Sequence, residues 1–194
     1  MWMQKIDFSN LDKLYRANLI NSATGCKPAH LIATKSAAGN ENVAIFSSVV
    51  HLGSYPALVG FVHRPVGDFS HTYKNILETD FYTINHVNQV IAKQAHQTHL
   101  KYAEEISEFS ACGLHTSYID NFYAPFVMES SIKMSLKLLE VIDIKYNETK
   151  FIIGEIINLY TDQNFIMDCG TFSLDKAGSI AVSGQDTYFN LSTI

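Results

Sequence analysis

Residues 132–138 hold the pattern that most constrains the fold of this chain. The segment Ile132-Lys-Met-Ser-Leu-Lys-Leu138 alternates apolar and polar side chains without interruption, which is the pattern of a β-strand with one buried face. Leu139 is a second consecutive leucine and breaks the alternation, so we predict a β-bulge at that point. A further apolar run, residues 151–160, predicts another strand close behind the first.

Five more segments have strand-like composition, and little helix separates them. They are residues 29–34, 42–48, 57–63, 81–87 and 180–183. The small and polar residues 36–41 predict a turn that joins the first two segments as a hairpin. Because the strands follow one another without regular crossover helices, we predict a mainly β protein, an antiparallel barrel with helical insertions, rather than a βαβ fold.

A few short helices are expected between these strands. Ser9 can cap a helix near the N-terminus, and Ser70 can cap a helix over residues 71–78. Apolar spacing predicts two further helical segments, in residues 87–98 and 101–109. The residues from Gly184 to Tyr188, taken alone, resemble an ordinary polar tail.

Length and charge limit the class of protein. The chain has 194 residues, which favours a single domain over residues 1–194, and a net charge of -5. An acidic chain of this kind argues against a general surface for nucleic acid or for an anionic membrane. No apolar run approaches the length of a membrane span.

The cysteines indicate a compartment. Cys26, Cys112 and Cys169 are odd in number and widely separated, so they form neither a CxxC unit nor a disulfide framework. The first residues have no basic segment followed by an apolar one, and therefore no signal peptide is recognisable. Together these features predict the reducing cytoplasm.

Several common motifs of enzymes are absent. No two glycines stand at GxG spacing, and the chain has no P-loop, HExxH or GxSxG motif. A nicotinamide cofactor would therefore not bind on a standard Rossmann turn. His96 and His99 would share a helix face, but they lack an obvious third ligand, so we predict surface histidines and no metal site.

One stretch is rich in hydrogen-bond donors although the chain as a whole is acidic. Between Asn42 and Asn75 the only acidic residue is Asp68. The basic residues and histidines of this stretch are Arg64, Lys74, His51, His63 and His71. One of these histidines could donate a proton, and the sequence does not say which.

The second half of this stretch is suited to a phosphate. Arg64 can bind a phosphate through its planar fork of donors. Ser70, His71 and Thr72 lie where a helix would begin, and the free N–H groups there attract anions. Each feature alone has a plain structural explanation, Ser70 as a cap and Arg64 as a surface residue. Their occurrence together after two strands favours a binding pocket.

The first half of the stretch is suited to a flat, mostly apolar ring. Asn42, Ser47 and Ser48 offer polar groups for the uracil-like edge of a flavin. The candidates for the apolar wall are Val43, Ile45 and Phe46. The alternative is that Asn42 is a turn residue and the serines fill an edge strand. Taken with the phosphate half, the pattern predicts a pocket for a phosphorylated aromatic ligand, and flavin mononucleotide (FMN) fits that description.

At these residues the chain resembles the flavin reductase-like family of split-barrel, FMN-binding proteins, which includes flavoredoxin and the reductase components of two-component monooxygenases. The matching residues are Thr34, Gly39, Asn42, Ser47, Ser54, Pro56, Arg64, Thr72, Asn75, Ile76, Phe81 and Asn85, with a looser match through residues 107–109 to Gly184 and Tyr188. The resemblance implies a split β-barrel of antiparallel, Greek-key type.

The resemblance also implies a homodimer with FMN near the subunit interface. Residues 42–48 would line the ring and the ribityl chain, and Arg64 with residues 70–72 would meet the phosphate. The full set of predicted cofactor-binding residues is Thr34, Asn42, Val43, Ala44, Phe46, Ser47, Ser48, Arg64, Ser70, His71 and Thr72. Many members have lysine and aspartate where this chain has Ser70 and His71, so the phosphate contact would depend more on Arg64.

The predicted function is that of an oxidoreductase that passes electrons from NAD(P)H through FMN to free flavin or to another acceptor, such as a monooxygenase. Hydride would go to the flavin, and the protein would position and tune it. No residue is identified as an essential acid or base. The alternatives are a non-catalytic FMN carrier and a barrel for another phosphorylated ligand, such as a pyridoxal phosphate relative.

Overall fold

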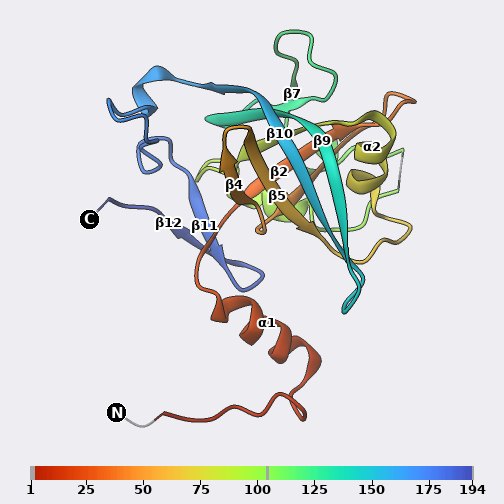
Figure 1. The fold of residues 1–194 in the computed structure, drawn as a ribbon, viewed down its shortest axis with the longest axis vertical. Coiled ribbons are helices and arrows are strands. Elements are labelled where there is room, and N and C mark those ends of the chain that lie inside the picture. Colours follow the sequence, from red (N-terminus) through yellow and green to blue (C-terminus); the bar gives the residue numbers. More distant parts are fainter. Residues whose placement is uncertain (1–2, 104, 194) are drawn as a thin grey trace.

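A seven-stranded antiparallel sheet forms the centre of the molecule (Figure 1). In this computed structural model, which describes residues 3–103 and 105–193, its strands lie in the order β3-β2-β6-β9-β10-β5-β4. The strands of this sheet are β2 (His30–Lys35), β3 (Glu41–Phe46), β4 (Val50–Ser54), β5 (Ala57–His63), β6 (Phe81–His86), β9 (Ile132–Ile144) and β10 (Thr149–Thr161).

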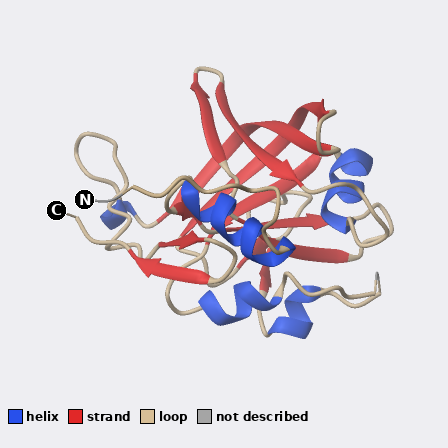
Figure 2. Ribbon diagram, turned by 90° about the horizontal axis from the view of Figure 1, so that it is seen from below, coloured by secondary structure: helices blue, strands red, loops and turns tan. Residues whose placement is uncertain are grey.

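Smaller elements surround this sheet (Figure 2). One small sheet consists of β1 (Lys27–Pro28), β11 (Ile180–Ser183) and β12 (Thr187–Asn190), and another of β7 (Thr116–Ser117) and β8 (Phe126–Val127). The helices are α1 (Lys13–Ala23), α2 (His71–Thr79), α3 (Ala92–Gln97), α4 (Glu108–Cys112) and the 3-10 helix Gln163–Phe165. The prediction of a mainly β, antiparallel protein with helical insertions is confirmed. The assignment of the whole chain to one domain stays a prediction.

Strand β2 separates two apolar clusters. Leu31 and Ala33 belong to a cluster shared with α3, α4 and β11, whereas Ile32 belongs to the cluster formed by β5, β6, β9 and β10. Successive side chains of a strand point to opposite faces, so β2 is buried on both. Helices α3 and α4 therefore cover its outer face, and they bring their own polar residues close to the neighbouring strand β3.

The strand predictions agree closely with the structure. Strands β2 and β3 form the predicted hairpin, paired from His30 with Phe46 to Lys35 with Glu41. The predicted bulge is also present, because Ile153 pairs with Glu140 and Gly154 pairs with Leu138, which leaves Leu139 without a partner on β10.

The first helix differs from the prediction in its start and in its packing. Its N-cap is Asp12, whose carboxylate accepts hydrogen bonds from the Leu14 and Tyr15 N–H groups at 2.9 and 3.1 Å; the predicted cap at Ser9 was wrong. A carboxylate is also the better cap electrostatically, because the helix N-terminus carries partial positive charge. Helix α1 buries no residue and extends away from the sheet (Figure 1).

Other helical segments are shorter than predicted, and several strands were missed, among them the two-residue strands β1, β7 and β8. Helix α3 begins only at Ala92, because the Asn88 side chain accepts hydrogen bonds from the N–H groups of Val90 and Ile91 and holds a turn there. In the segment 101–109, the described residues are helical only from Glu108 onward. Strand β4 was not predicted, and strand β12 includes residues predicted to be a tail.

Strand β12 is held by a histidine. His96 Nδ1 lies 2.9 Å from the Tyr188 hydroxyl, and the rings of His96 and His99 have centroids 4.6 Å apart.

Within residues 3–103 and 105–193 there is no group of three or more metal-ligating side chains. In the same residues no helix is both long and apolar enough to cross a membrane. Cys26, Cys112 and Cys169 are free.

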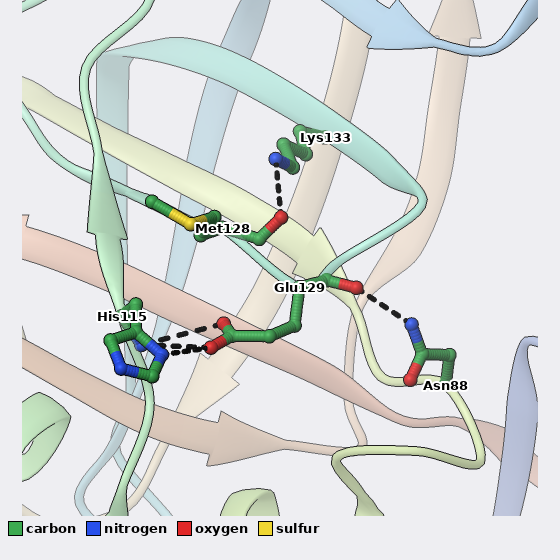
Figure 3. A network of polar contacts seen from close by, with 5 residues as sticks. All are labelled: Asn88, His115, Met128, Glu129 and Lys133. Atoms are coloured by element: carbon green, nitrogen blue, oxygen red, sulfur yellow. Dashed lines mark hydrogen bonds and ion pairs between the residues drawn. The ribbon is translucent and has the colours of Figure 1, made fainter.

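Polar contacts hold the connection between β8 and β9 (Figure 3). The Asn88 amide donates to the Glu129 carbonyl at 2.8 Å, and the Glu129 carboxylate accepts the His115 N–H at 3.1 Å. Lys133 Nζ donates to the Met128 carbonyl at 3.0 Å. These bonds satisfy backbone groups of a segment outside the strands, and so they fix the chain as it enters β9.

A glycine makes room for a tyrosine in the core. Tyr82 is fully buried, and its hydroxyl makes no hydrogen bond to the described residues. Burial raises the pKa of Tyr82. A Cβ atom on Gly154 would lie 2.0 Å from the Tyr82 hydroxyl oxygen, so only glycine permits this close approach between β10 and β6.

We therefore expect Gly154→Ala to lower the free energy of unfolding by about 2–3 kcal/mol, the scale of an overpacked core. Gly67→Ala is the matched control, because nothing lies within 4 Å of the added Cβ there. Urea denaturation of the two variants and the wild type measures the difference. Equal stability of Gly154→Ala and wild type would contradict this role of Gly154.

Candidate functional site

Helix α2 begins without a side-chain cap. Ser70 is its N-cap residue, but the structure shows no capping bond from this side chain. The Ser70 hydroxyl instead accepts a hydrogen bond from the Gly67 N–H at 2.9 Å. The first N–H groups of a helix have no partner inside the helix. The N–H groups of His71 and Thr72 are therefore available to an anion, as the sequence predicted for a phosphate.

Arg64 lies close to this helix in sequence and directly follows β5. It is exposed, and the ion pairs of the described residues do not involve it. Its backbone is held by His63, whose Nδ1–H donates to the Arg64 carbonyl at 2.6 Å. Burial lowers the pKa of His63, which favours the neutral ring. The guanidinium thus extends from a fixed backbone and has no competing carboxylate partner among the described residues.

A buried polar cluster fixes α2 on the sheet. Thr34 Oγ1 of β2 accepts a hydrogen bond from the Asn75 amide at 3.0 Å. The Asn42 amide of β3 contacts Thr72 Oγ1 at 2.9 Å. All four side chains are 8% exposed or less. Buried polar groups need such partners, so these bonds specify the position of α2 across the ends of β2 and β3.

Glu108 belongs to this cluster, and the sequence interpretation missed its role. It is the first residue of α4, is 6% exposed, and accepts a hydrogen bond from the Val43 N–H at 3.4 Å. Burial raises the pKa of Glu108. The only signal in the sequence was its place in the loosely matching residues 107–109, and nothing in that pattern indicated contact with β3.

Two hollows adjoin the cluster. One has a volume of about 490 Å³ and is lined by Ser36, Val66, His71, Tyr73, Lys74, Asn75, Leu77 and Glu78. The other, of about 10 Å³, is lined by Ser36, Asn40, Glu41, Asn42, His71, Asn75, Ile106 and Glu108. Ser36, His71 and Asn75 line both hollows, so these residues separate the outer surface of α2 from the buried carboxylate of Glu108.

The predicted ring-binding residues lie on an edge strand. Strand β3 is the last strand of the sheet, so one edge of its backbone is left for other partners. Val43 is fully buried in the outer apolar cluster, and Ala44, Phe46 and Ser47 are half-buried. Phe46 packs edge-on against Phe61, with ring centroids 5.1 Å apart. Strand β3 thus combines an outer edge that pairs with no further strand of this sheet with an aromatic surface.

Ser48 holds this edge strand close to β5. Its hydroxyl donates to the Val62 carbonyl at 3.0 Å and accepts from the Val62 N–H at 3.1 Å. These bonds use the backbone groups that a neighbouring strand would otherwise pair. They therefore connect the chain just after β3, one end strand of the sheet, to β5, which lies next to the other end strand, β4. They also occupy a hydroxyl that the sequence assigned to the ligand.

The family's sequence model, described as "Flavin reductase like domain", matches residues 24–169. The chain belongs to the flavin reductase-like family. The matched region contains the uncapped end of α2, Arg64, the buried cluster and β3. The resemblance stated from the sequence is thereby confirmed.

Solved structures agree with this assignment. A candidate flavin reductase with a split barrel domain from Shewanella frigidimarina NCIMB 400 is 44% identical, with 98% of this chain and 97% of that chain covered and a TM-score of 0.93. Nitrilotriacetate monooxygenase component B from Bacillus cereus is 16% identical, with coverage of 100% and 98% and a TM-score of 0.88. An FMN-binding domain of a flavin reductase-like enzyme from Shewanella baltica OS155 is 17% identical, with coverage of 94% and 94% and a TM-score of 0.71.

We expect Ser48→Ala to lower the free energy of unfolding by about 1–2 kcal/mol, because it leaves the Val62 N–H and carbonyl without their partner. Ser47→Ala is the matched control. It changes the half-buried neighbour and should alter stability by less than about 0.5 kcal/mol. Thermal and urea unfolding of both variants provide the comparison, and equal losses would show that Ser48 does not hold β3 to β5.

Proposed function

We propose that this protein binds FMN and passes electrons from NAD(P)H through it to free flavin or to another acceptor. The observation that carries the proposal is the uncapped N-terminus of α2, preceded by Arg64, which has no ion-pair partner among the described residues, in a flavin reductase-like domain. A phosphate monoester has about two negative charges. Helix N–H groups and a planar guanidinium are the donors that such an anion binds.

The phosphate would bind between Arg64 and the residues Ser70, His71 and Thr72. The N–H groups of the first turn would donate to it, and Arg64 would add a charge-assisted pair of bonds. Thr34 supports the site indirectly, because it holds α2 through Asn75. Lys74 donates to the Asp68 carbonyl at 2.9 Å and so stabilises the loop that precedes the helix.

The isoalloxazine ring would bind along β3. Asn42, the second residue of this strand, lies inside the buried cluster, and the half-buried Ala44, Phe46 and Ser47 follow it in the chain. The free edge of β3 supplies backbone N–H donors for the polar edge of the ring, while Phe46 supplies an apolar surface. Val43 would contribute through its backbone carbonyl, since its side chain is fully buried and its N–H donates to Glu108.

FMN, when bound, supplies the acceptor for hydride from the nicotinamide. The residues of this chain bind and orient the flavin, and the backbone donors of β3 stabilise negative charge at the ring edge. His63 is an unsuitable proton donor, because burial lowers its pKa and its Nδ1–H donates to the Arg64 carbonyl. No residue is assigned as an acid or a base.

The functional unit would be a homodimer with FMN near the interface, in the cytoplasm. Helix α1 buries no residue within one chain, and its apolar side chains Leu14 and Tyr15 are 61% and 60% exposed. Val50 and Leu52 of the edge strand β4 are also 46% and 43% exposed. Exposed apolar side chains of this size are typical of an interface. A monooxygenase component is a further expected partner, by analogy with the Bacillus cereus protein.

We expect Arg64→Ala to weaken FMN binding by about 1.5–3 kcal/mol, the scale of a hydrogen bond to a charged group. Lys145→Ala, an exposed cation in the turn between β9 and β10, should leave the affinity unchanged. Fluorescence titration with FMN and with riboflavin separates the contributions, because riboflavin lacks the phosphate. If Arg64→Ala weakened both ligands equally, the assignment of Arg64 to the phosphate would be wrong.

The purified protein, loaded with FMN, should lose its absorbance near 450 nm when NADH or NADPH is added without oxygen. The cause would be reduction of the bound flavin by hydride. Anaerobic spectrophotometry with dithionite as the positive control measures this. If dithionite bleached the bound flavin but NADH and NADPH did not, the function would be that of a non-catalytic FMN carrier. A protein that takes up no FMN would refute both the reductase and the carrier.

A further inference from the structure

His63 has a ring nitrogen to which the proposed function gives no role. Its Nδ1 lies 2.6 Å from the Arg64 carbonyl oxygen. Its Nε2 makes no hydrogen bond with the described residues and yet is not fully buried, although the residue as a whole is only 8% exposed. The ring is therefore held in place, and Nε2 stays accessible to a group that enters the site.

The bond at Nδ1 determines which ring nitrogen carries the proton. A carbonyl oxygen can only accept a hydrogen bond, so Nδ1 must hold the proton that it donates to Arg64. In a neutral imidazole the other nitrogen then has a free lone pair. Burial lowers the pKa of His63, which favours this neutral form. Nε2 is thus a hydrogen-bond acceptor, and a hydroxyl group is a suitable donor to it.

His63 lies between the two halves of the proposed FMN site. Its ring centroid is 6.2 Å from that of Phe46, which would supply the apolar surface for the flavin ring. It directly precedes Arg64, which would bind the phosphate. The ring centroid of Tyr73, in the first turn of α2, is 5.4 Å from that of His63. The imidazole thus contacts both the ring half and the phosphate half.

The contact between the end of β3 and the end of β5 produces this arrangement. Ser48 holds the two segments together through the Val62 N–H and carbonyl. Phe46 packs edge-on against Phe61, with ring centroids 5.1 Å apart. Alternate residues of a strand point to the same face, so His63 lies on the same face of β5 as Phe61. His63 therefore faces Phe46 across this junction.

The ribityl chain of FMN connects the isoalloxazine ring to the phosphate and carries several hydroxyl groups. A ligand with its ring along β3 and its phosphate at the start of α2 must place this chain between them, beside His63. A hydroxyl that leaves water for a binding site needs a new partner. An accessible acceptor at this point supplies one.

We propose that His63 Nε2 accepts a hydrogen bond from a ribityl hydroxyl, and that His63 thereby selects flavins that carry a ribityl chain. This inference rests on the proposed function and adds a specificity-determining residue to the same site. FMN and riboflavin both have the ribityl chain, whereas lumiflavin has a methyl group in its place. The contribution of His63 should therefore be the same for FMN and riboflavin and absent for lumiflavin. The contribution of Arg64, in contrast, requires the phosphate.

The test is a fluorescence titration of the full-length protein with FMN, riboflavin and lumiflavin, for wild type, His63→Phe and His63→Gln. His63→Phe keeps a flat ring but has no acceptor. We expect it to bind FMN and riboflavin about threefold to tenfold more weakly than wild type, the scale of one net hydrogen bond, and to bind lumiflavin equally well. His63→Gln can place its carbonyl oxygen near the position of Nε2 and should recover part of the loss.

Nitrogen-15 NMR of the histidine rings in the wild-type protein gives a readout that needs no variant to fold. The His63 Nε2 signal should have the shift of an unprotonated nitrogen. It should move strongly when riboflavin binds and little when lumiflavin binds, because only riboflavin offers a hydroxyl. A protonated Nε2 in the free protein, or equal movement with the two ligands, would overturn the proposal.

The titrations separate the proposed bond from other roles of His63. An equal loss with all three ligands in His63→Phe would show that the imidazole only packs against the flavin. A loss confined to FMN would show that it acts through the Arg64 backbone on the phosphate. Either result, or no loss at all, would overturn the proposal while leaving flavin binding intact. If wild type bound none of the three ligands, the proposed function would fail as well.

Discussion

The hydrogen bonds between α2 and the ends of β2 and β3 are the interaction on which the proposed site depends. Thr34 and Asn42 come from the hairpin, and Thr72 and Asn75 come from the helix. Each of these polar groups is buried, so an unmade bond would cost about 1–3 kcal/mol. The cluster therefore allows one position of the helix, and that position brings its uncapped N-terminus to the same end of the sheet as Arg64.

The sheet around this cluster is open at two edges, and the protein handles each edge differently. Strand β3 is covered on its outer face by α4, whose Glu108 accepts from the Val43 N–H, and Ser48 fastens the following residues to β5. Strand β4 keeps Val50 and Leu52 exposed. Edge strands with exposed apolar residues invite pairing with another chain, which agrees with a dimer in which the flavin site lies near the interface.

Much of the fold was predictable because strand signals are local. The alternation in residues 132–138, the bulge at Leu139 and the turn between β2 and β3 each depend on a few neighbouring residues, and all are present. The start of α2 at His71 was predicted for the same reason. Strand β12 was missed, because its contact with His96 joins residues 92 apart in the chain, and no local pattern reveals that contact.

The sequence identified the polar residues of the candidate site, but it did not predict the partners to which they hydrogen-bond. The sequence selected Asn42, Ser48 and Thr72 as ligand contacts because their polar groups had no evident partner. In the structure each has one, and the partners Glu108, Val62 and Asn42 lie 66, 14 and 30 residues away in the chain. Such pairings arise from tertiary packing, so no local pattern could reveal them. Arg64 and His71, in contrast, remain free of ion pairs with described residues, as the phosphate hypothesis requires.

The central claim is that the phosphate of FMN binds at the N-terminus of α2. Amide chemical shifts in ¹H–¹⁵N NMR spectra, recorded during titrations with FMN and with riboflavin, test it most directly. The account predicts that the N–H signals of His71 and Thr72 shift strongly with FMN and little with riboflavin, since only FMN supplies an acceptor to these donors. Strong shifts elsewhere with unchanged signals at these two residues would contradict it.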